Sequence, residues 1–218
     1  MLKQFRKGKI EISQLSKRKL LWFVAATLIL LSVSILIMSQ HLQPKPAQTV
    51  SYSTSEPSET KPGKDYKWQG GPDDPKKIII PKLGIDAYVQ NVGVDQNKQV
   101  AVPNNLYIVG WFTGSVKPGA LGLSVIDGHV TGRVNDGVFK NLERLSGGDE
   151  YSVQFGNGAV KKFKVTGKKS VPVNDAVSYI FSQDPMIDSQ LNLVTCSGNY
   201  DANSHSYSER LVVYSEKI

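Results

Sequence analysis

The chain has 218 residues, of which 40% are hydrophobic and 21% charged, so it can build one folded domain around an apolar core. Its single cysteine, Cys196, excludes an intramolecular disulfide and any metal site made of several cysteines. The formal net charge of +7 would favour nucleic-acid binding only if the folded domain carried it.

Most of that charge lies at the N-terminus. Residues 1–19 hold seven Lys or Arg residues and one Glu, whereas residues 76–218 hold fifteen basic and thirteen acidic residues. A domain that binds nucleic acid usually carries its own basic face, so the nearly neutral C-terminal part argues against a nucleic-acid partner. We interpret residues 1–19 as a basic cytoplasmic tail.

An uncharged apolar segment, residues 20–38, follows the tail. As a helix with a rise of 1.5 Å per residue it would extend about 28 Å, close to the roughly 30 Å thickness of the bilayer interior. The alternatives are a buried soluble helix and a cleaved signal peptide, but residues 40–43 lack the small side chains of a cleavage site. We predict an uncleaved, single-pass membrane anchor with a cytoplasmic N-terminus and an extracellular C-terminal part.

Residues 39–75 contain six of the eleven prolines, separated mainly by Ser, Thr, Lys and Glu. So few apolar side chains cannot offset the entropy that a chain loses when it becomes ordered. The composition therefore predicts a stiff spacer between the anchor and a folded domain at residues 76–218.

The folded domain is predicted to be mostly β-structure. Asn157 and Gly158 indicate a hairpin turn between two strands. Short helices are expected at residues 138–145 and at residues 175–181, the second with Asn174 as its cap. About eight strands with few helices favour a closed or nearly closed β-barrel. The eight short segments, rich in β-branched or aromatic residues, are Lys77–Pro81, Ile85–Gln90, Leu106–Phe112, Leu121–Asp127, Tyr151–Phe155, Val160–Val165, Gln190–Thr195 and Leu211–Tyr214.

Cys196 follows the apolar segment 190–195 and precedes a loop rich in Ser, Asn and Gly. A rigid strand end beside an open loop suits a nucleophile that a substrate must reach. The alternative is a buried, inert cysteine, which is the common fate of a free thiol. Outside the membrane, however, a lone free cysteine is unusual.

A thiol at neutral pH needs a proton-transfer partner, because only about 3% of it is ionised when its pKa is near 8.5. Three histidines are available. His41 lies in the spacer and His205 in a loop, where a histidine is usually solvated. His129 ends an apolar strand directly after Gly128, and it is the preferred candidate.

A third group is expected where negative charge develops on a substrate carbonyl. Arg210 begins the last apolar segment, and antiparallel pairing with the strand before Cys196 would bring the two residues to neighbouring strand ends. A guanidinium stays protonated and can donate hydrogen bonds to an oxyanion. Taken alone, Arg210 is more often a solvated charge, so the hypothesis depends on the combination of the three residues.

With these residues in place, the sequence resembles the sortase family. Residues 193–196 match the family's LxTC motif, Arg210 follows fourteen residues after Cys196, and the Gly-His pair ends sixty-seven residues before it. The motifs around residues 109–111, 118–119 and 125–130 look most like class F, with class E next. Asn192 departs from the fuller motif, where Thr is often found, and this bears on the subclass more than on the chemistry.

The resemblance implies a cysteine transpeptidase on an eight-stranded β-barrel that cleaves a C-terminal sorting signal similar to LPXTG in exported proteins. By this resemblance Cys196 attacks the Thr carbonyl, Arg210 holds the substrate and its oxyanion, and His129 exchanges the proton with the amine. Thr195 is expected to help place the substrate. The acyl group then passes from a thioester to an amine of a cell-wall precursor, to a pilin lysine or to water. Neither a cofactor nor a metal is implied.

Two alternatives stay open at this point. One is another exported thiol enzyme, although the packed His-Gly-Cys motif of L,D-transpeptidases is missing and papain-like proteases place the cysteine before the histidine. The other is a non-catalytic anchored surface module in which Cys196 belongs to the core. The sequence leaves open the preferred signal, the acceptor, the protein substrates, the oligomeric state and any dependence on calcium.

Overall fold

The computed structural model describes residues 21–22, 26–28, 30–32, 34, 56–95 and 99–218, and the chain divides into units of residues 1–45 and 46–218. In the first unit the described residues are helical and exposed, and the Ser34 hydroxyl donates to the Leu30 carbonyl at 2.8 Å. Within the described residues no helix is long and apolar enough to cross a bilayer. The predicted tail and much of the predicted anchor lie outside those residues.

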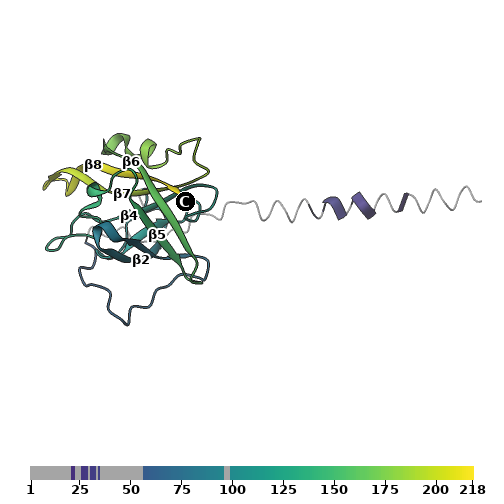
Figure 1. The fold of residues 1–218 in the computed structure, drawn as a ribbon, viewed down its shortest axis with the longest axis horizontal. Helices are drawn as coiled ribbons and strands as arrows, with labels where there is room; N and C mark the ends of the chain where they lie inside the picture. Colours follow the sequence, from purple (N-terminus) through teal and green to yellow (C-terminus); the bar gives the residue numbers. More distant parts are fainter. Residues whose placement is uncertain (1–20, 23–25, 29, 33, 35–55, 96–98) are drawn as a thin grey trace, which may run out of the picture. The chain divides into compact units, whose positions relative to one another are not determined.

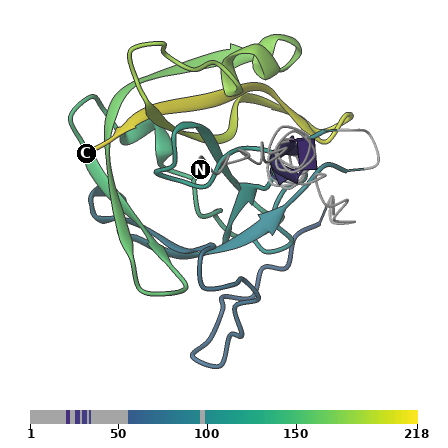
Figure 2. The same ribbon diagram turned by 90° about the vertical axis from the view of Figure 1, so that its right-hand side faces the viewer.

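The second unit contains a closed eight-stranded barrel (Figures 1 and 2). Its strands follow the order β1-β2-β3-β4-β7-β8-β6-β5 around the barrel. All eight predicted segments contribute to strands, which confirms the predicted all-β barrel. The bounds are β1 Pro75–Ile80, β2 Ile85–Val92, β3 Val109–Phe112, β4 Gly122–Gly128, β5 Glu150–Phe155, β6 Val160–Pro172, β7 Ser189–Asp201 and β8 Ser206–Lys217.

The barrel interior is filled by side chains that alternate along the strands. Tyr151, Val153 and Phe155 of β5 are buried, whereas Ser152 and Gln154 between them are partly exposed. This is the period of two that a half-buried strand requires. In β7, Leu191 and Leu193 belong to the same central core, at 0% exposure each.

A second apolar cluster covers the outer face of β4, β7 and β8. Val125, Val194 and Val212 are buried there, and Ile180 at the end of the helix α2 (Ala176–Ile180) packs against them. Both faces of β4 and β7 are therefore buried along part of their length. This outer cluster lies next to the candidate site, because Val125, Val194 and Ile180 also line its cavity.

The helices are shorter than the sequence predicted. Within residues 138–145 only the 3-10 turn η2 (Leu142–Arg144) forms. The amides of Leu142, Arg144 and Leu145 donate to carbonyls three residues back instead of four, which is the 3-10 and not the α-helical pattern. The other 3-10 turns are η1 (Pro81–Leu83) and η3 (Val173–Asp175).

The predicted cap of the second helix is also wrong. Asn174 lies inside η3, directly before α2, and Asp175 occupies the capping position without a side-chain hydrogen bond. The 3-10 turn begins at Val173, so Asn174 lies within the helical stretch and not at its N-terminal cap.

The predicted spacer, residues 39–75, contacts the barrel at several places in its described part. Residues 39–55 lie outside the described part, and Pro75 begins β1. Between them the Trp68 indole Nε1–H donates to the Val89 carbonyl at 2.8 Å, and the rings of Tyr66 and Tyr88 lie 4.7 Å apart. Aromatic side chains thus hold this segment against β2, even though it contains few apolar residues.

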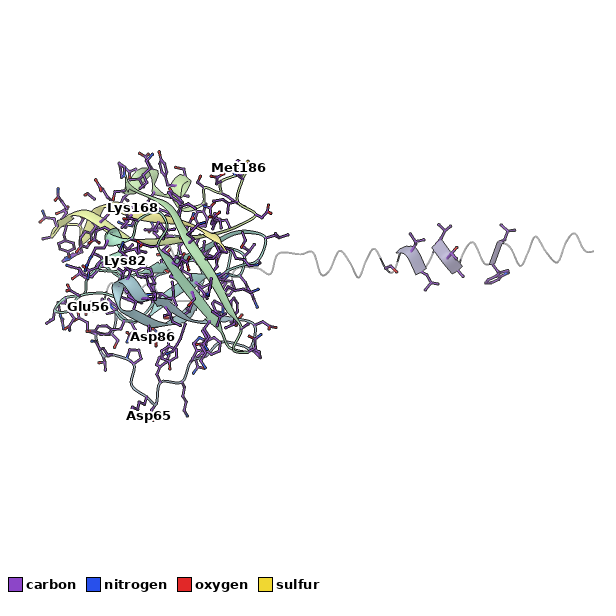
Figure 3. All side chains as sticks on the ribbon, viewed as in Figure 1. Glu56, Asp65, Lys82, Asp86, Lys168 and Met186 are labelled. Atoms are coloured by element: carbon purple, nitrogen blue, oxygen red, sulfur yellow. The ribbon has the colours of Figure 1, made fainter. Side chains whose placement is uncertain are left out.

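Charged side chains of both signs cover the barrel (Figure 3). Lys82 pairs with Asp149 at 2.7 Å, and Lys77 pairs with Asp86 at 2.9 Å. Interspersed charges of this kind agree with the nearly neutral composition of the domain. Asp65 lies near the tip of a loop that extends from the barrel (Figure 3).

Candidate active site

The sheet topology brings the end of β4 beside the middle of β7 and β8. Cys196 and Arg210 lie inside these two strands, which pair as far as Asp201 and Ser206, so the strand ends and the open loop predicted directly after Cys196 are wrong. Strands β4 and β7 are parallel, with Asp127 paired to Val194, so the end of β4 lies beside the part of β7 that carries Cys196. Strand β8 runs antiparallel to β7 and pairs Arg210 directly with Cys196. Because side chains of direct partners project to the same face of a sheet, the thiol and the guanidinium share one face.

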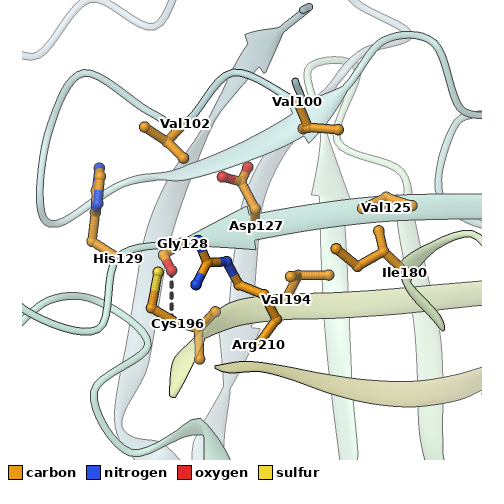
Figure 4. A pocket seen from close by; sticks show the side chains of 11 residues that line it. Val100, Val102, Val125, Asp127, Gly128, His129, Ile180, Val194, Cys196 and Arg210 are labelled. Atoms are coloured by element: carbon orange, nitrogen blue, oxygen red, sulfur yellow. Dashed lines mark hydrogen bonds between the residues drawn. The ribbon is translucent and has the colours of Figure 1, made fainter. Parts of the chain in front are cut away.

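Thr195 joins the ends of β4 and β7. Its hydroxyl donates to the Gly128 carbonyl at 2.7 Å, and the residue is 4% exposed. This hydrogen bond fixes the backbone directly before His129 relative to the backbone directly before Cys196 (Figure 4).

The three predicted catalytic side chains line a single cavity of about 110 Å³. Figure 4 shows His129, Cys196 and Arg210 grouped around the end of β4. Aliphatic side chains supply most of the remaining wall. The full lining is Val100, Val102, Val125, Asp127, Gly128, His129, Ile180, Val194, Thr195, Cys196 and Arg210.

A second and more polar cavity, of about 300 Å³, meets the first at Cys196. Its wall includes Lys140, Glu143, Ser197 and Tyr207. The thiol is half-buried and reaches both cavities, so it is not sealed in the barrel core. One cavity can hold the acyl side of a bond that the sulfur attacks, while the other admits the leaving group or the incoming group.

The surroundings of Cys196 act on its pKa in opposite directions. Burial of the thiol raises its pKa, and the nearby Asp127 carboxylate adds to this, whereas the Arg210 guanidinium lowers it. Burial is the largest effect, so the neutral thiol is favoured in the free protein. Arg210 is the group that stabilises the thiolate when it forms.

His129 is held in one orientation by the loop that follows β2. Its Nε2 lies 2.7 Å from the Pro103 carbonyl oxygen. A carbonyl can only accept, so Nε2 must carry the hydrogen, and Nδ1 is the nitrogen left to accept a proton in the neutral ring. Burial lowers the pKa of His129 more than the Pro103 carbonyl raises it, so the neutral ring is favoured.

Arg210 is anchored by its own strand. Its Nη1 donates to the Glu209 carbonyl at 2.9 Å and to the Tyr207 carbonyl at 3.3 Å. Among the described residues it forms no salt bridge with a carboxylate. Its remaining N–H groups are therefore available to a ligand on the cavity side, toward which the guanidinium extends in Figure 4.

His205 does not line this cavity. His205 is exposed in the turn between β7 and β8, at a φ of 50°, and its Nδ1 lies 3.2 Å from the Tyr200 hydroxyl. His41 lies outside the described residues.

Sequence reasoning missed Asp127, which lies two residues before His129 and lines the same cavity. The available signal was one acidic residue within the otherwise uncharged strand Ser124–Gly128. It was read only as the end of a strand, because the sequence does not say which face of the barrel is covered.

The model of the sortase domain matches residues 78–218 of this chain. The chain belongs to the sortase family. Two similar solved structures are a Clostridium perfringens sortase D5 transpeptidase, 21% identical with a TM-score of 0.50, and sortase A from Corynebacterium diphtheriae, 24% identical with a TM-score of 0.50. The first alignment covers 67% of this chain and 79% of that one, and the second covers 69% and 63%.

A lid mutant of the Corynebacterium diphtheriae sortase A is 25% identical, with a TM-score of 0.52, and its alignment covers 69% of this chain and 73% of that chain. No curated protein matches the chain. This sortase is therefore an enzyme of the cysteine transpeptidase type on the family's barrel. The family match decides against the other thiol peptidases and the non-catalytic module considered from the sequence.

Proposed function

We propose that this sortase cleaves an LPXTG-like sorting signal through a thioester on Cys196 and transfers the acyl part to an amine. The observation that carries the proposal is that a half-buried thiol, a half-buried imidazole and a guanidinium without a salt bridge to any described residue line one small cavity. These are the nucleophile, the proton carrier and the oxyanion donor that acyl transfer requires.

In the first half-reaction the Cys196 sulfur attacks the Thr carbonyl of the signal. Its proton passes to Nδ1 of His129, because Nε2 is occupied by Pro103. Arg210 donates hydrogen bonds to the oxyanion of the tetrahedral intermediate. When the peptide bond breaks, the imidazolium gives its proton to the departing Gly amine, and the thioester remains.

In the second half-reaction an amine attacks the thioester and loses a proton to His129, and the thiol is released. The acceptor is an amine of a cell-wall precursor or a pilin lysine, with water as the hydrolytic alternative. Thr195 contributes by fixing Gly128, and so the backbone that carries His129, at the substrate site. No cofactor takes part in this scheme.

We further propose the domain organisation that the sequence predicts: a cytoplasmic tail at residues 1–19, a transmembrane anchor at residues 20–38, a connecting segment at residues 39–75 and an extracellular catalytic domain at residues 76–218. Anchoring would keep the enzyme, its exported protein substrates and the acceptor at one membrane surface. Within the family, the motifs favour class F over class E.

The test is acyl-enzyme formation by the full-length chain with peptides that contain LPXTG-like signals, with and without an amine acceptor. Mass spectrometry of the intact protein should detect a thioester on Cys196 and, when the amine is present, a transpeptidation product. The Cys196→Ala variant should form neither. Normal product formation by that variant would overturn the proposal.

A further inference from the structure

Asp127 carries an acidic group into the cavity that holds the predicted catalytic residues. It belongs to β4, is 9% exposed, and lines the cavity together with Cys196 and Arg210. Its Oδ1 is buried and accepts no hydrogen bond from any residue in the described part of the chain. Buried polar atoms without partners are rare in folded proteins and point to a role that the free protein does not satisfy.

The immediate surroundings offer no structural reason for the acid. Within the described residues Asp127 forms no salt bridge, although Arg210 lines the same cavity, and four valines and Ile180 make up the apolar part of the wall. Gly110, its direct partner on β3, leaves the room that the carboxylate occupies, because a Cβ there would lie 2.4 Å from Oδ1. An apolar residue would fit these neighbours better than a carboxyl group does.

The strand register gives the position of Asp127 relative to the predicted catalytic residues. Asp127 pairs with Val194, and one step further along the same face lie His129, Cys196 and Arg210. Two residues of a strand span about 6.6 Å. An extended peptide with its reacting carbonyl at the sulfur and its acyl side in the apolar cavity would therefore place a residue about two positions upstream near Asp127. Figure 4 shows the carboxylate between β4 and the side chains of Val100 and Val102.

We propose that Asp127 is a specificity-determining residue of this sortase, selecting a sorting signal with a hydroxyl or carboxamide side chain on the acyl side of the cleaved bond. The inference rests on the proposed function, since it concerns the peptide bound at Cys196. A carboxyl group that accepts and donates hydrogen bonds matches an uncharged donor. A purely apolar side chain would leave Oδ1 buried and unpaired in the complex as well.

The burial of Asp127 is the reason why the selected substrate side chain should be uncharged. Burial raises the pKa of the Asp127 carboxyl well above its ordinary value, and no basic side chain offsets this shift. A neutral carboxyl favours hydroxyl and amide partners. A cationic side chain would have to enter a wall of aliphatic groups before it reached an ionised partner.

The experiment measures acylation of Cys196 in the full-length chain by peptides that differ in isosteric pairs, Thr against Val and Asn against Leu, at each of the three positions upstream of the signal Thr. For the wild type we expect acylation about tenfold faster with the donor-bearing member at one position. In Asp127→Val the ratio at that position should fall to about one, and Asp127→Asn, which keeps an acceptor and a donor, should retain part of it.

Ser124→Ala is the matched control. Ser124 lies on the same strand, is fully buried and also has an unpaired side-chain oxygen within the described residues, but it does not line the cavity. Its peptide ratios should equal those of the wild type. Equal ratios in wild type and Asp127→Val would overturn the inference, as would a preference for Val and Leu, or for Lys, at all three positions. Failure of every peptide to acylate Cys196 would instead overturn the proposed function, and this inference with it.

Discussion

Cys196 and Arg210 are direct cross-strand partners on β7 and β8. Their proximity is therefore set by the backbone register of the barrel and not by the flexible turn that connects the two strands. A one-residue slip in this pairing would send the guanidinium to the opposite face of the sheet. The ladder from Gln190 opposite Glu216 to Ser197 opposite Glu209 holds this register, which shifts only beyond it, between Ser197 and Tyr200.

Replacing Arg210 should abolish most of the transpeptidation while the barrel stays folded. Removal of an oxyanion donor typically costs about 10²–10³ in kcat, and we expect a loss of this size in Arg210→Ala. Arg210→Lys should recover little, since an ammonium lacks the planar fork that Nη1 uses to dock on Glu209 and Tyr207. Steady-state peptide kinetics measure the effect, with the exposed Arg144→Ala as a control that should behave like the wild type. An Arg210→Ala variant of normal activity would remove the guanidinium from the mechanism.

Much of the barrel could be predicted because each strand carries its own local signal. The alternation at Tyr151, Val153 and Phe155 and the Asn157–Gly158 turn act over only a few residues. The helix predicted at residues 138–145 failed for the opposite reason. Hydrogen bonds to Leu106 and His129 fix the path of the chain at Val138 and Phe139, and these long-range contacts are invisible in a local window.

His129→Ala should reduce the rate far more than His205→Ala. The first loses the imidazole beside the thiol and should cost about 10²–10⁴ in kcat/KM, the usual contribution of a general acid or base. The second removes an exposed ring whose described contact is with Tyr200, so activity should change little. Peptide cleavage rates of the two variants decide between them. Equal losses would leave the proton carrier unassigned.

Alkylation of Cys196 should rise with pH through a pKa above the ordinary thiol value, because burial disfavours the thiolate. Arg210 lowers this pKa, so Arg210→Ala should shift the profile to higher pH. Iodoacetamide labelling of the native chain over a range of pH, followed by mass spectrometry, gives the alkylation profile of each variant. A shift in the reverse direction would contradict the electrostatic arrangement described for the cavity.

The candidate site was only partly readable from the sequence. The predicted catalytic residues Cys196, His129 and Arg210 could be singled out because each stands at the end of an apolar segment. Pro103 and Asp127 could not, since their importance depends on which loop covers which face of the barrel. The same limit applies to residues 56–74, where polar composition predicts a spacer but scattered contacts bind the segment to the barrel.

Within that segment, Ser58 and Glu59 lie between two loops that hold His129. Ser58 pairs with Asn105, close to the carbonyl of Pro103 that binds the imidazole. The Glu59 carboxylate accepts hydrogen bonds from three consecutive amides of residues 133–135, in the loop just after His129. A carboxylate in such a nest of amides fixes the backbone around it. The connecting segment thus supports the imidazole from both sides.

We therefore expect Glu59→Ala to speed amide hydrogen exchange at residues 133–135 and to lower activity without changing the alkylation profile of Cys196. Hydrogen bonds, first of all from the Asn135 side chain, lower the pKa of Glu59, so its support should be complete above the ordinary carboxyl pKa and lost only as the pH falls through the lowered value. Glu59→Gln keeps an acceptor oxygen without the charge and should be intermediate.

The same contacts predict that a fragment of residues 76–218 unfolds at a lower temperature than one of residues 56–218, and that it cleaves peptide more slowly. Identical melting curves and rates for the two fragments would mean that the segment is only a spacer.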